Sequence, residues 1–193
     1  MALEAFSWER MVAAVDGVRE RARRAAQALN EAGIPFVVVG GHAVALWVSR
    51  VDEEAVRNTK DVDILVRRDD FPRVIAALEA AGFVHRFVYG VDLFLDGPEG
   101  SVRSGVHIVF AGERVQPDYP EPTPEVTECE AGPEFPIPTL EALVRMKLTS
   151  FRLSDQVHLI DLWDVGLLDE SWFERLSPPL AERLREIERE RRR

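Results

Sequence analysis

Two aspartates, Asp61 and Asp63, flank a single valine at the start of the apolar segment DVDILV, residues 61–66. In an extended strand these two side chains point to the same face, about 7 Å apart along the backbone. Burying two carboxylates there is costly unless a cation or hydrogen-bond donors meet them. Carboxylate oxygens are the ligands that Mg²⁺ prefers, so the pair is a candidate catalytic and metal-binding site. The alternative is a structural pair that is bonded to Arg57 or Lys60.

Gly40 and Gly41 form a second candidate site, at the end of an apolar, β-branched run at residues 36–39. Glycine lets the backbone approach a ligand closely, and the free amides of a helix N-terminus attract phosphate. His42 follows directly, so its side chain is expected either to contact phosphate or to fill the helix N-terminus. Glycines followed by a strand with paired acids indicate a triphosphate and a metal ion in one pocket.

Periodicity predicts the elements that carry these residues. Helices are expected at residues 8–32, 42–49 and 71–81, and strands at residues 36–39, 61–66, 86–95 and 106–110. Asp69 or Asp70 is expected to cap the third helix, and the turn at residues 96–100 is expected to join the last two strands as a hairpin. This order predicts a single α/β core in a chain of 193 residues.

The composition changes after residue 115. Residues 116–138 contain seven prolines and many glutamates, which predicts an extended connector across the surface. Helices are expected to resume after Thr139, a typical N-cap residue, at residues 140–152, 155–165 and 170–193, with a break in the last one at Pro178 and Pro179. The expected organisation is a core with an N-terminal helix at 1–115, a connector at 116–138 and a helical C-terminal region at 139–193.

Composition and charge exclude several classes of protein. Hydrophobic residues make up 46% of the chain, which excludes global disorder, and the apolar runs are too short to cross a bilayer. Residues 1–5 lack a secretory signal and the single Cys129 cannot form an internal disulfide, so a cytoplasmic protein without membrane contact is expected.

A net charge of −10 disfavours a general nucleic-acid-binding surface, because phosphate neutralisation needs clustered basic residues. Arginines nevertheless gather near both ends of the chain. They are solvated helix faces or a local contact with an RNA or DNA acceptor. The two groups are Arg19, Arg21, Arg23 and Arg24, and Arg189, Arg191, Arg192 and Arg193.

The segments VGGHA (residues 39–43) and RNTKDVD (residues 57–63) together resemble the DNA polymerase β-like nucleotidyltransferase superfamily. The likeness is to its small prokaryotic branch, which includes the AbiEii-like abortive-infection toxins, where Gly-Gly-x-Ala precedes Arg-x-Thr-x-Asp-x-Asp. It covers residues 34–110 and extends to Lys147, Arg152 and Asp155, which are similar to the Lys and Arg-x-x-Asp features that follow the core in such proteins. The resemblance implies an α/β (α+β) nucleotidyltransferase fold, a mixed β-sheet flanked by helices, whose helical C-terminal region closes over the nucleotide.

The resemblance also implies roles for individual residues. Gly40 and Gly41 would contact the triphosphate, and Asp61 and Asp63 would bind Mg²⁺. Lys147 would neutralise phosphate charge, unless it is only a solvated position on an amphipathic helix. Two further residues, Arg57 and Thr59, would position the aspartates or cap the strand.

Two features depart from the family pattern. The stretch between Gly41 and Asp61 is longer than usual, with the excess at residues 49–55, which is expected to be a loop insertion. The place of the family's third acid is occupied by His107. A neutral imidazole can assist a metal or act as a base, but Mg²⁺ prefers oxygen. Asp92 would substitute if its strand lay beside Asp63; otherwise slow or absent transfer is expected.

Other histidines carry weaker signals. His158 and Asp161 share a helix face, and with Asp155 they either imitate a metal site or form a polar stripe near the cleft. His85 is expected at the surface.

The sequence therefore predicts an Mg²⁺-dependent nucleotidyltransferase. It would move a nucleoside monophosphate from a triphosphate to a hydroxyl of RNA, protein or a small molecule. The alternatives are a degenerate domain that binds nucleotide or a partner protein without catalysis, and a toxin–antitoxin component.

Overall fold

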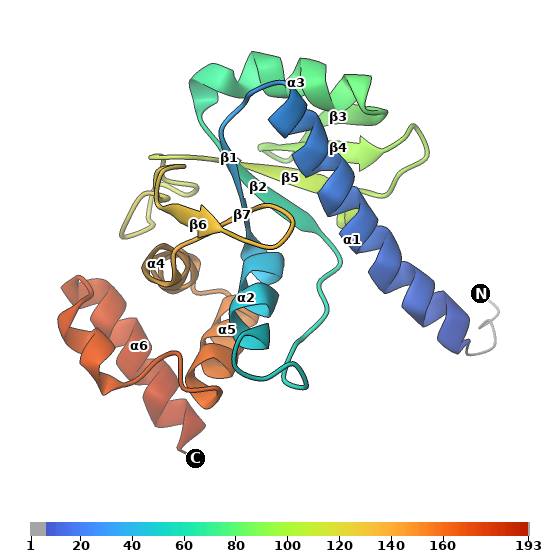
Figure 1. The fold of residues 1–193 in the computed structure, drawn as a ribbon. Coiled ribbons are helices and arrows are strands. Elements are labelled where there is room, and N and C mark those ends of the chain that lie inside the picture. The colour runs from blue at the N-terminus through green and yellow to red at the C-terminus, as the bar shows by residue number, and fades with distance from the viewer. Residues whose placement is uncertain (1–6, 193) are drawn as a thin grey trace.

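The apolar runs of the chain form a five-stranded mixed sheet in the computed structural model, which describes residues 7–192. The strand order is β1-β2-β5-β4-β3; β2 and β5 are parallel and the other neighbours are antiparallel (Figure 1). The strands are β1 (Phe36–Val39), β2 (Val62–Val66), β3 (Phe83–Val88), β4 (Val91–Asp96) and β5 (Val106–Phe110). A mixed sheet of this kind confirms the predicted fold class.

Two helices, α1 (Trp8–Glu31) and α3 (Phe71–Ala80), cover one face of this sheet (Figure 1). The alternation predicted for β2 is confirmed, because Val62, Ile64 and Val66 are buried in the core beneath these helices. Leu65 belongs to a separate apolar cluster on the opposite face. That opposite face is also the one to which Asp63 points, since side chains alternate along a strand.

The remaining helices pack together around a second core. They are α2 (Gly40–Ser49), α4 (Leu140–Ser150), α5 (Leu153–Asp164) and α6 (Pro178–Arg191). Ala43, Val44 and Val48 of α2 are buried against apolar residues of the C-terminal helices. Thr139 caps α4 as predicted, because its hydroxyl accepts a hydrogen bond from the Ala142 amide at 3.2 Å. Thus α2 joins the C-terminal helices to the sheet.

Two predictions about the core are wrong. The segment at residues 86–95 is not one strand, because a turn at Tyr89 and Gly90, both with positive φ, divides it into the hairpin β3–β4. Apolar residues on both sides of that turn conceal it in the sequence. Asp70 precedes α3 but makes no capping bond, since its carboxylate accepts a hydrogen bond from Arg73 at 2.9 Å instead.

The proline-rich connector is not simply an extended surface segment, which corrects another prediction. It contains two short paired strands, β6 (Cys129–Ala131) and β7 (Pro136–Pro138), and Ile137 is fully buried. Proline lacks an amide hydrogen and is confined to the edges of sheets. Prolines on both sides of Ile137 therefore allow a short edge strand whose central side chain enters the core below α1.

Short 3₁₀ turns complete the described chain. They are η1 (Arg68–Asp70), η2 (Val102–Ser104) and η3 (Glu170–Glu174). The break predicted at Pro178 and Pro179 is confirmed, because α6 begins at Pro178, where the missing amide hydrogen costs nothing. The part predicted before the break is the 3₁₀ turn η3 and not an α-helix.

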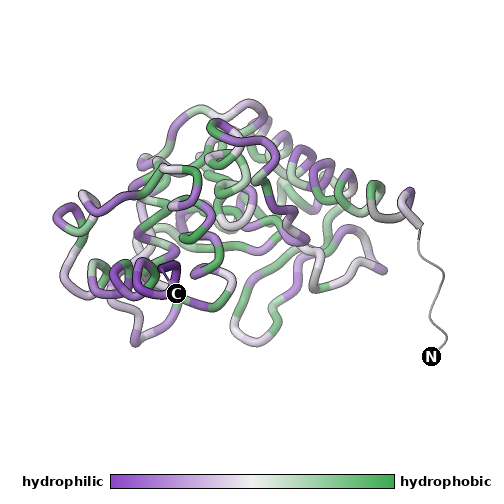
Figure 2. Tube along the Cα trace, turned by 90° about the horizontal axis from the view of Figure 1, so that it is seen from below, coloured by the Kyte–Doolittle hydropathy of each residue, from purple (hydrophilic) through white to green (hydrophobic). Residues whose placement is uncertain are grey.

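Hydrophilic and hydrophobic residues alternate along α1, and hydrophilic ones dominate the C-terminal helix (Figure 2). None of the helices within residues 7–192 is long and apolar enough to cross a bilayer. The first five residues, for which the sequence predicts no secretory signal, lie outside the described part of the chain.

We predict that Ile137→Ala lowers the free energy of unfolding by about 2–5 kcal/mol, the usual cost of truncating a fully buried aliphatic side chain. Val115→Ala is the matched control, because Val115 is 55% exposed close to the start of the same connector; its effect should stay within about 0.5 kcal/mol. Urea unfolding monitored by tryptophan fluorescence measures both. Equal midpoints for the two variants would show that β7 contributes nothing to the core.

Candidate functional site

The antiparallel register of β1 and β2 sets Gly40 against Asp63. Val39 lies opposite Asp63, and Gly40 follows with a φ of +69°. A Cβ atom at Gly40 would collide with the Asp63 carboxylate, and one at Gly41 would lie 2.8 Å from the Thr59 hydroxyl. Glycine is therefore required at both positions, for the positive φ at the first and for space at both.

The turn formed by Gly40 and Gly41 is called the glycine corner below. Three possible metal ligands converge beside it. Asp63 lies directly opposite His107 in the parallel pair of β2 and β5. His107 is therefore beside the paired acids, where the family resemblance implies a third acid. The His107 Nδ1 atom is 3.5 Å from Asp63 Oδ1 and 3.9 Å from Asp61 Oδ2. One ligand atom from each of the three residues lies within 4.8 Å of the others. Two carboxylates and one imidazole can hold a divalent cation, and the carboxylates suit Mg²⁺.

Asp92 does not replace the missing acid. Its strand, β4, lies beyond β5 and sets Leu93 opposite His107, so Asp92 points to the other face of the sheet. There it lies 2.8 Å from His85 Nε2. His85 itself is half-buried between the rings of Phe71 and Phe94, so it lies at the surface only in part.

Thr59 and Arg57 have different partners. The Thr59 hydroxyl donates a hydrogen bond to Asp61 Oδ1 at 2.9 Å, which restrains that carboxylate. Arg57 does not bind Asp61 or Asp63; its Nε donates to both carboxylate oxygens of Asp161, at 2.7 and 3.0 Å. Asp161 lies on α5, so this ion pair joins the loop before β2 to the C-terminal helices. No local pattern in the sequence indicates a pair so far apart in the chain.

A cleft of about 410 Å³ lies between the glycine corner and the C-terminal helices. Gly41, Thr59, Asp61 and Asp63 form one side of it. The other side comes from α4 and α5 and from Arg152 between them, and carries Lys147, Arg152, His158 and Asp161. The cleft therefore combines carboxylates that can bind a cation with positively charged side chains that can bind phosphate. Asn58, Lys60 and Ser154 also line it, although their sequence context does not mark them as cleft residues.

His42 lies behind this cleft and is not one of the residues that line it. Its ring packs edge-on against Phe135, with centroids 6.4 Å apart. Burial lowers the pKa of His42, although the nearby charges of Asp63 and Asp61 oppose that shift. The geometry favours the helix N-terminal packing role over a phosphate contact.

Lys147 is 5% exposed, so the alternative of a solvated helix position is wrong. Its ammonium donates to Asp155 Oδ1 at 2.9 Å, and Asp155 also accepts from Ser150 and from Arg152. Burial alone would raise the pKa of Asp155, but Arg152 and Lys147 together hold it well below its ordinary value. The carboxylate is consequently a fixed negative centre that keeps both cations beside the cleft.

These cations also act on Asp63. Burial raises the pKa of Asp63, but the hydrogen bond with His107 and the positive charges of His107, Lys147 and Arg152 outweigh it, so the net pKa is lowered. In His107 the pKa is raised, first by its hydrogen bond with Asp63. Asp63 is therefore ionised at neutral pH, as a metal ligand must be.

His158, Asp161 and Asp155 do not form a second metal site. Asp155 accepts hydrogen bonds from Lys147 and Arg152, and Asp161 accepts them from Arg57. Within residues 7–192 the cluster of metal-type ligands is Asp61, Asp63 and His107. Burial and the charge of Lys147 lower the pKa of His158 to about 4, so it faces the cleft as a neutral imidazole.

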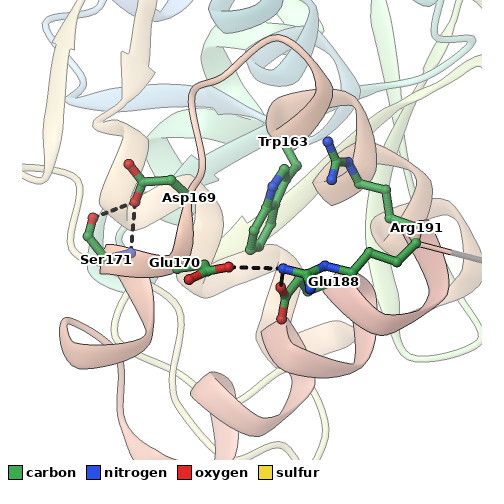
Figure 3. Close-up of a pocket in the computed structure, with 7 residues that line it drawn as sticks. Trp163, Asp169, Glu170, Ser171, Glu188 and Arg191 are labelled. Carbon is green, nitrogen blue, oxygen red and sulfur yellow. Dashed lines mark hydrogen bonds and ion pairs between the residues drawn. The ribbon is translucent and has the colours of Figure 1, made fainter.

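A second hollow, of about 500 Å³, lies between η3 and α6 (Figure 3). Its charged groups are paired with one another: Arg192 donates to Glu170 at 3.0 Å, and Asp169 accepts from the Ser171 amide at 2.9 Å. Because these groups bind one another, the described residues that line the hollow contain no converging set of metal ligands like that of Asp61, Asp63 and His107.

The family described as uncharacterised nucleotidyltransferase matches residues 7–127. The match spans more than half of the chain, and the protein belongs to this nucleotidyltransferase family. A comparison with curated protein sequences found no match.

One of the solved structures that resemble this chain shows the same fold. A putative nucleotidyltransferase from H. pylori is 14% identical, with a TM-score of 0.51 over 94% of this chain and 77% of its own. The structure of ANT(2")-Ia in complex with adenylyl-2"-tobramycin is 16% identical, with a TM-score of 0.48 over 92% of this chain and 97% of its own. At 14% identity, the H. pylori protein shares the fold alone with this chain.

We predict that Gly40→Ala abolishes nucleotide binding, because the new Cβ must displace the Asp63 carboxylate. Gly33→Ala is the matched control: Gly33 also has a positive φ, of +61°, but an added Cβ there would have no other atom within 4 Å. Both variants should lose about 1–2 kcal/mol of stability from backbone strain. Calorimetric titration with a triphosphate should separate them, and equal binding by both would show that the contact with Asp63 is unimportant.

For His158 we predict a titration midpoint near pH 4 in ¹H NMR spectra, assigned by the signal that His158→Gln removes. Because the folded pKa lies below the ordinary 6.5, the unfolded chain takes up this proton first. His158 should thus reduce stability as the pH falls from 6.5 towards 4, and His158→Gln should reduce that dependence. A midpoint near 6.5 would contradict the burial of the ring.

Proposed function

We propose that the protein transfers a nucleoside monophosphate from a nucleoside triphosphate to a hydroxyl group and releases pyrophosphate, with Mg²⁺ held by Asp61 and Asp63. One observation carries the proposal: the glycine corner, the paired acids and a buried lysine share one cleft. Membership in a nucleotidyltransferase family supports the reaction class. The use of nucleoside triphosphates also agrees with the cytoplasmic location expected from the sequence.

The residues of the cleft have distinct roles in this proposal. Gly41 stands at the N-terminus of α2, where free amides and the helix dipole favour a phosphate group. Arg152 and Lys147 supply positive charge from the opposite side, and Thr59 restrains Asp61. A divalent cation, when bound, neutralises the charge of the triphosphate and polarises the phosphoryl group under attack.

The bond changes define what the cleft must accommodate. The acceptor hydroxyl releases its proton to solvent as its oxygen forms a bond to the α-phosphorus. The bond between that phosphorus and the oxygen bridging to the β-phosphate breaks, and pyrophosphate leaves. Negative charge develops on the departing pyrophosphate, and fixed cations placed there contribute most of the catalysis in such reactions. Lys147 and Arg152 are held for this role by Asp155.

The arginines of both clusters that the structure describes, all except Arg193, are engaged in internal ion pairs, which bears on the acceptor. Near the N-terminus, Arg19 and Arg23 bind Glu134, and Arg21 and Arg24 bind Asp96. At the other end, Arg189, Arg191 and Arg192 bind Glu182, Asp164 and Glu170. These pairs reduce the positive charge available for phosphates, so a small molecule or a protein side chain is better supported than RNA.

A second candidate function is a degenerate domain that binds nucleotide, or a partner protein, without transferring anything. The presence of His107 in place of a third acid favours it, because an imidazole at that position changes how an acceptor hydroxyl is activated. Incubation with labelled triphosphates and cell lysate separates the two, since only the enzyme labels an acceptor. An AbiEii-like toxin role within a toxin–antitoxin pair stays a prediction, which growth arrest on expression would test.

We predict that the double variant Asp61→Asn, Asp63→Asn loses Mg²⁺-dependent triphosphate binding, because both anionic ligands of the cation are removed. Asp92→Asn is the matched control, since Asp92 lies on the other face of the sheet with His85. Calorimetric titrations with and without Mg²⁺ measure the effect. An unchanged isotherm in the double variant would overturn the proposed site.

A further inference from the structure

We infer that His107 is a metal ligand through Nδ1 and that it shifts the preference of the site from Mg²⁺ towards a first-row divalent transition-metal ion such as Mn²⁺. The inference rests on the proposed function for one point, the binding of a cation by Asp61 and Asp63. It assigns to this chain a metal preference that the carboxylate pair alone would not produce.

The first support is the orientation of the ring. His107 Nε2 lies 3.2 Å from the Val102 carbonyl oxygen. A carbonyl only accepts hydrogen bonds, so Nε2 carries the hydrogen and donates it. In the neutral ring, Nδ1 is then the nitrogen with the free lone pair, and it faces the two aspartates. Histidines that bind metals commonly have this arrangement, with the second nitrogen donating to a backbone carbonyl.

The backbone before β5 holds the ring in this position. Val102 belongs to the turn η2, and the main chain returns through Gly105, where an added Cβ would lie 3.0 Å from the Phe94 carbonyl of β4. Close packing at Gly105 lets the turn fold back over His107. The orientation of the imidazole is consequently set by the main chain as well as by the acids.

The second support is the spacing of the donor atoms. Ligands on one ion with bonds of about 2.1 Å are about 3.0 Å apart when adjacent and about 4.2 Å apart when opposite. The distances of 3.5 and 3.9 Å from Nδ1 to the aspartate oxygens lie between these values. A protonated Nδ1 can donate to Asp63. Once Nδ1 has lost its proton, it and the two carboxylates are all acceptors, and a bound cation then makes their convergence favourable.

The third support is the chemistry of the donors. Mg²⁺ binds oxygen and retains much of its water, whereas imidazole nitrogen suits transition-metal ions. Mn²⁺ accepts carboxylate, phosphate and imidazole ligands together, so it fits this donor set and a triphosphate. Among the first-row divalent transition-metal ions, Mn²⁺ binds a given site most weakly. A preference for Mn²⁺ over Mg²⁺ therefore indicates a nitrogen ligand and not only the general affinity of transition-metal ions.

The test compares Mn²⁺ and Mg²⁺ binding in the wild-type protein, in His107→Asp and in the control His85→Gln. Free Mn²⁺ is measured by electron paramagnetic resonance, and Mg²⁺ by competition. We expect the ratio of Mn²⁺ to Mg²⁺ affinity to fall about tenfold or more in His107→Asp, and to stay unchanged in His85→Gln, whose ring lies on the other face. Pulsed spectra of bound Mn²⁺ should show ¹⁴N coupling from a histidine that His107→Asp removes.

A second variant, His107→Gln, keeps the test decisive if His107→Asp fails to fold, because it also removes the nitrogen ligand without adding a charge. An unchanged affinity ratio, or ¹⁴N coupling that persists without His107, would overturn the inference while the proposed function stands. Equal Mn²⁺ binding by the Asp61→Asn, Asp63→Asn variant would instead remove the metal site on which the proposed function depends.

Discussion

The close approach of Gly40 to Asp63 is the constraint on which the rest of the site depends. Antiparallel pairing of β1 and β2 fixes it, and only a residue without a side chain leaves room for the carboxylate. The same register starts α2 beside the acids, so that a helix N-terminus and a pair of anions share one pocket. Positive charges are needed to stabilise the paired acids, and Lys147 of α4 and Arg152, between α4 and α5, supply them.

Those opposite charges are organised around a buried acid. Asp155 is completely buried and accepts hydrogen bonds from Lys147, Ser150 and Arg152. Without it, two cations would face the cleft under mutual repulsion. Removing one member of such a buried set leaves an uncompensated charge, so the cluster is fixed as a unit. The cationic side of the cleft thus depends on packing among the C-terminal helices.

The sequence predicted the central part of the fold well because local patterns determine it. β1 and β5 were predicted at their observed limits. The neighbouring positions of Asp63 and His107 were expected from the family resemblance, which gave His107 the place of the third acid. Predictions failed where distant packing decides. Ile137 enters the core although prolines surround it, and Lys147 is buried because Asp155 meets it. The bond between Arg57 and Asp161 likewise joins residues with no shared local pattern.

Trp47 of α2 touches both apolar cores, and its indole nitrogen donates to the Pro138 carbonyl at 3.1 Å. Asp63 and His107 lie on strands of the sheet, and Asp61 directly precedes β2, whereas Lys147 lies on α4 of the second core. A tilt of one core relative to the other about this tryptophan would widen or narrow the cleft. The spacing of Asp61, Asp63 and His107 would stay constant during such a movement, so substrate entry and metal coordination can be adjusted separately.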